Sequence, residues 1–210
     1  MTDCRGSPTP LVPNEKILSL KEDPEQEKAS VAEHQRFMQA VGGIQYIAVV
    51  TRPDLAFAAH ALARHMAGSA KKHWLAAQHV MRYLQRTIDV GLVFNGSKGN
   101  GCVLEAFTDA DFANGASLKS VSGVLLRMHG NCVFWRSKRQ SIVAGDTTEA
   151  ELIAMSSAAN ELMWAKQLCT DLHIEANRPT LWGDNKSANL LAVNPISNDT
   201  SKHIRVEIFV

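Results

Sequence analysis

The sequence predicts an α/β fold: a mixed sheet, made of a three-stranded antiparallel meander and one parallel strand, with flanking helices. A small helical region is expected before the sheet. Three observations support this prediction. Three short segments have the composition and period of strands, a long helical pattern follows them, and a fourth strand comes after that helix. The segments are residues 103–108, 121–128, 132–135, 147–172 and 180–183.

Residues 1–30 are expected to form an extended linker. They contain four prolines and a polar run over residues 21–28. Such a segment has little apolar surface with which to offset the entropy lost on ordering.

The first helix is expected to begin near Val31, because apolar residues recur at three- and four-residue steps from there. These residues are Phe37, Val41, Ile44 and either Ile47 or Ala48. The turn Thr51-Arg-Pro-Asp54 places a proline at the first position of a second helix over residues 55–64. Gly68 and Ser69 mark the end of that helix.

A third helix is expected from about residue 72 to residue 86. Its apolar face is made of Trp74, Ala77, Met81, Leu84 and Ile88. Three basic side chains, His79, Arg82 and Arg86, lie along another face. That stripe is either a solvated surface or a surface that follows a phosphate backbone.

Residues 90–94 are expected to form a short strand. Residues 95–101 form a loop by composition, and the domain boundary is placed there. Further on, His129-Gly-Asn131 indicates a hairpin turn between two strands. A short helix is expected over residues 186–193 and ends before Pro195. The residues of the long helix expected to face inward are Leu152, Met155, Ala159 and Leu162.

The composition is that of an ordinary globular protein, with 45% apolar and 20% charged residues. There is no run of 18 apolar residues and no apolar stretch at the N-terminus, so neither a membrane span nor a secretion signal is expected. The four cysteines are scattered, which favours reduced intracellular thiols over a disulfide frame or a zinc site. A net charge of +1 permits nucleic-acid binding without predicting it.

Three acidic residues lie at the ends of the elements expected in the sheet region. Asp109 ends the first strand, Glu151 lies near the start of the long helix, and Asp184 follows the fourth strand. These carboxylates converge if the fourth strand pairs beside the first. Their mutual repulsion then calls for a hard cation such as Mg²⁺ or Mn²⁺. Two such ions about 3.5–4 Å apart suit the in-line hydrolysis of a phosphodiester.

Each acid also has a structural interpretation. Asp109 and Asp111 could begin a turn, and Asp184 could be the N-cap of the helix that follows it. Asp146 and Glu149 have the spacing of a capping box, which leaves Glu151 as the candidate ligand on the helix.

Longer segments of the chain match a known family. In the sheet region they are Phe107-Thr-Asp-Ala-Asp-Phe-Ala113, Trp135-Arg-Ser-Lys-Arg-Gln-Ser141, Thr148-Glu-Ala-Glu-Leu152 and Gly183-Asp-Asn-Lys-Ser-Ala188. In the helical region they are Ala48-Val-Val-Thr-Arg-Pro-Asp-Leu-Ala-Phe-Ala58 and Val80-Met-Arg-Tyr-Leu-Gln-Arg-Thr87. The chain therefore resembles the C-terminal part of the Pol polyprotein of copia-type LTR retrotransposons. The first group resembles its ribonuclease H domain, and the second group resembles the end of its reverse transcriptase.

The resemblance implies an RNase H-like fold and Mg²⁺-dependent hydrolysis of the RNA strand of an RNA–DNA hybrid. It implies that Asp109, Glu151 and Asp184 are catalytic and bind two Mg²⁺ or Mn²⁺ ions. Lys186 stands where the family usually has Gln, and it is expected to approach the substrate backbone.

The same resemblance divides the chain. Residues 31–95 are expected to be the helical C-terminal segment of reverse transcriptase, and residues 102–210 an RNase H-like domain that lacks its last strand and helix. The family's fourth metal-binding acid would lie on that helix, and Arg205 stands where the family has Asp. The implied partners are the hybrid and the remainder of the Pol polyprotein, including the fingers and palm of reverse transcriptase. The expected location is intracellular, in a cytoplasmic virus-like particle or in the nucleus.

Two functions follow from the sequence. One is a ribonuclease H-type hydrolase of weak or no activity in this chain. The other is an inert or binding-only remnant that holds nucleic acid without cutting it. The basic residues expected to contact nucleic acid, besides Lys186, are Arg82, Arg86, Arg136, Lys138 and Arg139, with His79 beside the first two.

Overall fold

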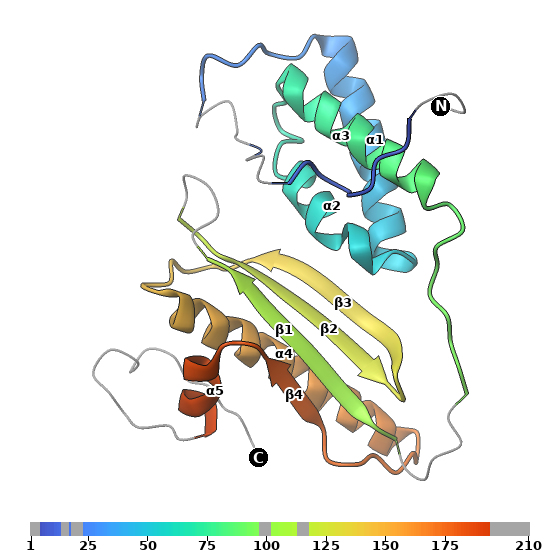
Figure 1. The fold of residues 1–210 in the computed structure, drawn as a ribbon, viewed down its shortest axis with the longest axis vertical. Coiled ribbons are helices and arrows are strands. Elements are labelled where there is room, and N and C mark those ends of the chain that lie inside the picture. Colours follow the sequence, from blue (N-terminus) through green and yellow to red (C-terminus); the bar gives the residue numbers. More distant parts are fainter. Residues whose placement is uncertain (1–4, 14–16, 18–22, 97–101, 113–117, 194–210) are drawn as a thin grey trace. The chain divides into compact units, whose positions relative to one another are not determined.

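The chain divides into two compact units, Met1–Leu92 and Val93–Val210. A computed structural model describes residues 5–13, 17, 23–96, 102–112 and 118–193. The first unit is built of helices, and the second contains the sheet (Figure 1). None of the helices in the described part of the chain has the length and hydropathy that crossing a membrane requires.

The helical unit contains α1 (Val31–Val50), the short 3₁₀ helix η1 (Pro53–Leu55), α2 (Ala56–Ala63) and α3 (Lys71–Arg86). A capping box between Ser30 and Glu33 begins α1. The apolar period expected in α1 is confirmed, because Phe37, Val41, Ile44 and Ala48 are all buried. They pack against buried side chains of the other helices, chiefly Leu55, Leu62, Ala77 and Val80.

The inner face of α3 differs from the expected one. Ile88 lies beyond the end of the helix and is 78% exposed. His73 is fully buried instead. Its Nδ1 accepts a hydrogen bond from the backbone N–H of Ala70 across 2.9 Å, and its ring stacks on that of His65 at 4.0 Å. The apolar pattern did not predict the burial of His73, because this polar side chain accepts a backbone hydrogen bond at the start of the helix.

Part of the expected N-terminal linker packs on the helical unit. The hydroxyl of Ser7 lies 2.7 Å from Nε2 of His79, and the backbone N–H of Ser7 donates to the carbonyl of Arg82. Gly6 permits this close approach, since a Cβ at that position would lie 2.7 Å from Cβ of Arg86. The described residues 5–13 are therefore not an extended tether, because polar contacts along α3 hold them.

Residues 90–94 do not form the short strand that the sequence predicted. Val93 and Phe94 are 74% and 64% exposed. A strand needs a neighbour to satisfy its backbone groups, and no strand in the described part of the chain pairs with this segment. The expected loop that follows lies largely outside the described residues.

The second unit contains β1 (Leu104–Asp111), β2 (Val121–Met128), β3 (Asn131–Arg139) and β4 (Thr180–Gly183) in the order β3-β2-β1-β4. The first three strands are antiparallel, and β4 runs parallel to β1 (Figure 1). The predicted fold class, a mixed sheet with flanking helices, is confirmed. Both β1 and β3 extend further than expected, since β2 supplies partners as far as Asp111 and Arg139.

The turn between β2 and β3 is the predicted hairpin. His129 and Gly130 have φ values of 49° and 78°. Positive φ at both central residues is typical of the two-residue turn whose twist matches that of the flanking strands.

Helix α4 (Thr147–Asp171) links the meander to β4, and α5 (Lys186–Val193) follows β4. The side of α4 that faces the sheet is rich in alanine, which allows close packing against the strands. Ala158 is fully buried, whereas Ala159, expected to face inward, is half-buried. The core between helix and sheet is made of Cys102, Leu104, Ala106, Val124, Leu126, Ala158, Leu162, Ala165 and Cys169.

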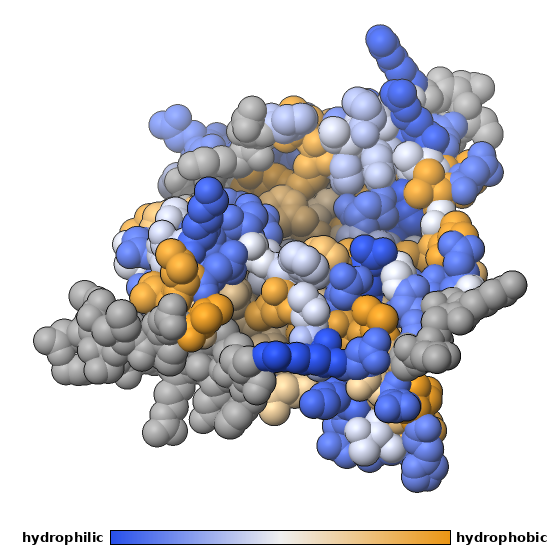
Figure 2. Space-filling view, turned by 60° about the horizontal axis from the view of Figure 1, so that its bottom comes forward, coloured by the Kyte–Doolittle hydropathy of each residue, from blue (hydrophilic) through white to orange (hydrophobic). Residues whose placement is uncertain are grey.

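Hydrophobic side chains are also exposed on the surface, including Trp164 at 57% and Leu172 at 60%. On the face drawn in Figure 2, hydrophobic residues form small groups between hydrophilic ones. Scattered apolar residues of this kind are normal on protein surfaces.

Candidate metal centre

The structure brings three carboxylates together. Asp109 of β1, Glu151 of α4 and Asp184, directly after β4, each offer an oxygen atom within 4.8 Å of the others. The parallel pairing of Thr108 with Gly183 explains this convergence. Asp109 and Asp184 each follow a member of that pair, so they reach the same end of two adjacent strands. These are the acids that the sequence singled out.

The structural interpretations of two of the acids are wrong. Asp109 does not begin a turn, because it lies inside β1 opposite Gly123. Asp184 does not cap α5. The cap is Asn185, whose Oδ1 accepts a hydrogen bond from the backbone N–H of Ala188 across 3.0 Å. Neither carboxylate is therefore needed for the local fold.

The start of α4 uses a different pair of acids. Asp146 is the N-cap, and its Oδ1 accepts from the backbone N–H of Glu149 across 2.7 Å. The carboxylate of Glu149 accepts from the backbone N–H of Gly145, not from that of Asp146 as a full capping box would require. These bonds hold Glu149 at the helix start, and Glu151, further along, reaches the cluster.

Glu151 has an unfavourable environment for a charged group. It is 7% exposed, whereas Asp109 and Asp184 are exposed. Burial raises the pKa of Glu151, and the carboxylates of Asp109 and Asp184 raise it further, while a hydrogen bond with the backbone of Ala110 opposes the shift. The folded chain therefore gathers negative charge here, and no cationic side chain of the described residues is among the causes of this shift.

A divalent cation fits this donor set. All three side chains offer oxygen, the ligand that Mg²⁺ and Mn²⁺ prefer, and no histidine or thiol belongs to the cluster. A cation would also remove the repulsion that raises the pKa of Glu151. The three carboxylates can thus hold a metal ion.

The basic residues of β3 do not act as one group. Arg136 is bound to α4: its guanidinium forms an ion pair with Glu161 at 2.9 Å and donates to Oγ of Ser157 at 2.7 Å. Lys138 and Arg139 are exposed. Because successive side chains of a strand point to opposite faces, these two do not share a surface. The sequence cluster is therefore divided by the strand that carries it.

The remaining basic candidates have different surroundings. Lys186 is the first residue of α5 and is exposed, two residues after Asp184. Arg82 and Arg86 belong to the helical unit. Arg86 is exposed, but Arg82 is half-buried and its Nε is buried without a hydrogen-bond partner. Arg82 thus contributes to packing beneath the N-terminal segment.

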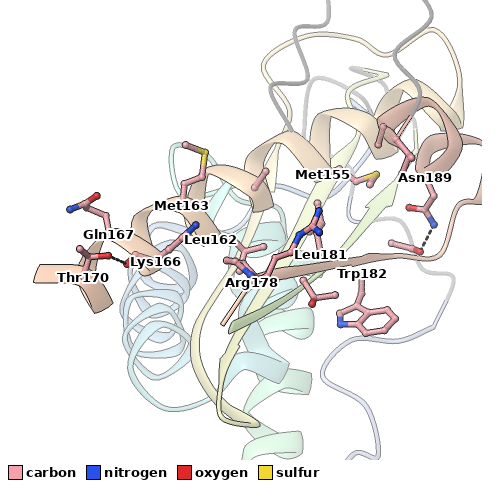
Figure 3. A pocket seen from close by; sticks show the side chains of 16 residues that line it. Met155, Leu162, Met163, Lys166, Gln167, Thr170, Arg178, Leu181, Trp182 and Asn189 are labelled. Atoms are coloured by element: carbon pink, nitrogen blue, oxygen red, sulfur yellow. Dashed lines mark hydrogen bonds between the residues drawn. The ribbon is translucent and has the colours of Figure 1, made fainter. Parts of the chain in front are cut away.

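A cavity of about 900 Å³ lies between α4, β4 and α5 but contains none of the three acids. Figure 3 shows side chains of α4, among them Met155 and Leu162, together with Leu181 and Trp182 of β4. Lys166 and Arg178 lie at the same cavity. The acids lie outside this apolar cavity, and two of them are exposed.

Two side-chain amides beside the acids were not predicted. Gln140 donates from Nε2 to the carbonyl of Ala150, and Asn189 donates from Nδ2 to the carbonyl of Gly183, both across 2.8 Å. Neither lies in a pattern of acids or bases. The resemblance covered Gln140 and the chain around α5, but these contacts follow from how the strands and helices pack.

Comparison with known proteins places the chain among transposon polyproteins. It is 35% identical over 209 residues to a retrovirus-related Pol polyprotein from transposon TNT 1-94 of Nicotiana tabacum, covering 98% of this chain and 15% of that polyprotein. It is 36% identical over 169 residues to that from transposon RE2 of Arabidopsis thaliana, covering 80% and 11%. The chain thus spans a small fraction of the length of these polyproteins.

A shorter relative covers most of its own length. The chain is 43% identical over 129 residues to the secreted RxLR effector protein 161 of Plasmopara viticola, which corresponds to 61% of this chain and 89% of the effector. No family model and no solved structure matches the chain. With matches to several plant transposon polyproteins over most of its length, the chain belongs to the Pol polyproteins of copia-type retrotransposons.

Proposed function

We propose that the second unit is a ribonuclease H-type module, which hydrolyses the RNA strand of RNA–DNA hybrids with Mg²⁺. The observation that carries this proposal is the convergence of Asp109, Glu151 and Asp184 within 4.8 Å. Three segments far apart in sequence supply one acid each, and the local fold needs neither aspartate.

The three carboxylates would hold the metal, and Mn²⁺ is the expected substitute for Mg²⁺. When bound, the ions supply an activated water and neutralise charge on the phosphodiester. Asp109 and Asp184 face solvent and can meet a polymer, while buried Glu151 fixes the inner side of the site. Lys186, exposed at the start of α5, is placed to approach the substrate backbone near Asp184.

The hybrid is the substrate that this family assignment supports. Protein contacts with such a duplex depend on its shape and on its 2′-hydroxyl groups. Lys138 and Arg139, exposed at the end of β3, are further candidates for phosphate contact. Arg136 is a weaker candidate because Glu161 and Ser157 already bind its guanidinium.

The relatives extend the proposal to the whole chain. These relatives are named as Pol polyproteins, and this chain matches a segment of each. Residues 31–95 then correspond to the trailing helices of reverse transcriptase, and residues 102–210 to the RNase H-like domain. The remainder of a Pol polyprotein is the expected protein partner. Arg205 lies outside the described residues.

Cleavage of an end-labelled RNA–DNA hybrid by the purified 210-residue chain tests the proposal. We expect cleavage in Mg²⁺, none in a chelator, and none of double-stranded DNA. Asp109→Asn should lower the rate by about a hundredfold or more, since it removes a metal ligand. Asp171→Asn, the same change at the exposed end of α4, is the matched control.

Two results would contradict the proposal. Cleavage that persists in Asp109→Asn would remove the carboxylate cluster from the reaction. Salt-dependent binding of the hybrid without any cleavage would favour a binding-only remnant.

A further inference from the structure

Gln140 connects three elements around the carboxylate cluster. It lies directly after β3 and is 6% exposed. Its Nε2 donates to Oγ of Ser122 on β2 at 2.9 Å and to the carbonyl of Ala150 on α4 at 2.8 Å. Its backbone N–H donates to the carbonyl of Ser120 at 2.8 Å. Both hydrogens of the amide nitrogen are thus used between sheet and helix.

These bonds belong to a hydrogen-bond network that connects the segments carrying Asp109 and Glu151. Ala150 precedes Glu151, and Ser122 is the partner of Ala110 across the β1–β2 pair. Ala110 follows Asp109, and its backbone is hydrogen-bonded to the Glu151 carboxylate. Asp109 and Glu151 are therefore connected in two ways, once through the backbone of Ala110 and once through the side chain of Gln140.

The bond to Ala150 is not needed to form the helix. The Ala150 carbonyl lies inside α4, where the backbone N–H four residues later is its regular partner. Asp146 already caps the start of the helix. A second donor on this carbonyl therefore fixes the rotation and depth of the first turns against β2, and with them the position of Glu151.

Asn189 makes the equivalent contact on the other side. Its Nδ2 donates to the carbonyl of Gly183, the residue before Asp184, at 2.8 Å. The fit is close, since a Cβ on Gly183 would lie 3.1 Å from Oδ1 of Asn189. Gly183 is also the partner of Thr108 in the β1–β4 pair. Asn189 thus anchors α5 to the strand end that carries Asp184.

We propose that Gln140 and Asn189 are positioning residues, which hold the carboxylates of Glu151 and Asp184 at the spacing required to share a divalent cation with Asp109. Each acts through the peptide group that precedes its acid. The inference rests on the proposed function, since it assumes that the three carboxylates bind a metal.

Calorimetric titration of the whole 210-residue chain with Mn²⁺ tests the inference. Partners outside the ligand shell typically change metal affinity about 10–100-fold when they are removed. We expect Gln140→Met and Asn189→Leu, which keep side-chain size but cannot donate, to weaken Mn²⁺ binding by about tenfold or more. Their far-ultraviolet circular dichroism should match that of the wild type.

Two controls separate positioning from stability. Gln167→Met makes the same change at an exposed site on α4, where the side-chain amide donates to the carboxylate of Asp171. Ala158→Gly destabilises the same helix without changing any residue of the hydrogen-bond network around Gln140. Both should bind Mn²⁺ as the wild type does, although Ala158→Gly lowers the melting temperature.

Wild-type affinity in folded Gln140→Met and Asn189→Leu would overturn the inference and leave the proposed function in place. If the wild type fails to bind Mn²⁺, or if Asp109→Asn binds equally well, the proposed function fails and the inference with it. If Gln140→Met does not fold, Ser122→Ala decides, since it removes only the anchor on β2. Severalfold weaker binding would support positioning, and unchanged binding would overturn it.

Discussion

Asn185 caps α5 through a 3.0 Å hydrogen bond from the backbone N–H of Ala188, and Asp184, one residue earlier, takes no part in that cap. The two neighbours therefore have separate tasks. Asn185 begins the helix, and the carboxylate of Asp184 is directed to Asp109 and Glu151.

Substitutions at these neighbours should have different effects on stability. Asn185→Ala removes the cap and should lower the free energy of helix unfolding by about 1 kcal/mol. Asp184→Asn removes one of three clustered negative charges, so it should leave stability unchanged or raise it in the absence of divalent cations. Urea unfolding, with hydrogen exchange of the α5 amides, measures both. Equal losses in the two variants would contradict the separation.

Glu151 should make the second unit less stable as the pH rises. Burial and the neighbouring acids raise its pKa, so the folded chain keeps a proton where the unfolded chain, at the ordinary value of 4.5, has lost it. This contribution is therefore most favourable below that value and is lost as the pH rises through the folded pKa. Urea unfolding between about pH 4 and pH 8 should show the decline in the wild type but not in Glu151→Gln.

The same repulsion makes stability respond to metal at neutral pH. A cation that binds only the folded chain adds about 2.7 kcal/mol at a concentration one hundred times its Kd. Glu151→Gln should reduce this gain, while the exposed control Glu175→Gln should retain it. If the stability of the wild type changed with neither pH nor Mg²⁺, repulsion of Glu151 by Asp109 and Asp184 would not explain the site.

The sequence was sufficient to single out the acids as a set, through their order along the chain and the family resemblance, although each acid alone also had a structural interpretation. Asp109 and Asp184 come after strand-like segments, and the spacing of Asp146 and Glu149 marks the start of α4. The parallel pairing of β4 with β1, also predicted, then brings the acids together.

The supporting contacts could not be predicted in the same way. The bond from Gln140 to Ala150 depends on how deeply α4 sits against β2, which no local period encodes. For Arg136 the sequence pattern suggested a role that its contacts in the structure do not favour. Its basic neighbours suggested a nucleic-acid surface, but Glu161 and Ser157 of α4 bind its guanidinium.

Arg136 and Lys138 should therefore respond differently to neutralisation. Arg136→Gln loses an ion pair that is partly exposed and should lower stability by about 0.5–1 kcal/mol, with little change in hybrid affinity. Lys138→Gln should leave stability unchanged and, if Lys138 contacts a phosphate, reduce the salt slope of hybrid binding by about 1. Fluorescence anisotropy at several salt concentrations measures the slope. A larger effect on the slope from Arg136→Gln would reverse this assignment.

The Arg52–Asp54 pair should determine how the helical unit responds to acid. The side chain of Arg52 is 6% exposed, and its guanidinium contacts Asp54 at 2.8 Å. The hydroxyl of Tyr83 donates to the same carboxylate at 2.7 Å. Arg52 also donates to the carbonyl of Thr87, so the pair joins the turn before α2 to the end of α3. Burial alone would raise the pKa of Asp54, but the bonds from Arg52 and Tyr83 outweigh it and lower this pKa.

A lowered pKa means that the charged form of Asp54 stabilises the folded unit above the ordinary value of 3.8, and that this contribution is lost as the pH falls through the folded pKa. Asp54→Asn should therefore lower stability at neutral pH by about 2 kcal/mol, because it leaves a buried guanidinium without its charged partner. The variant should also lose less stability than the wild type on acidification. Asp23→Asn, which breaks a more exposed pair with Lys72, should have little effect. Hydrogen exchange of α1 and α3 amides resolves this unit from the other, and equal protection in Asp54→Asn and wild type would contradict the prediction.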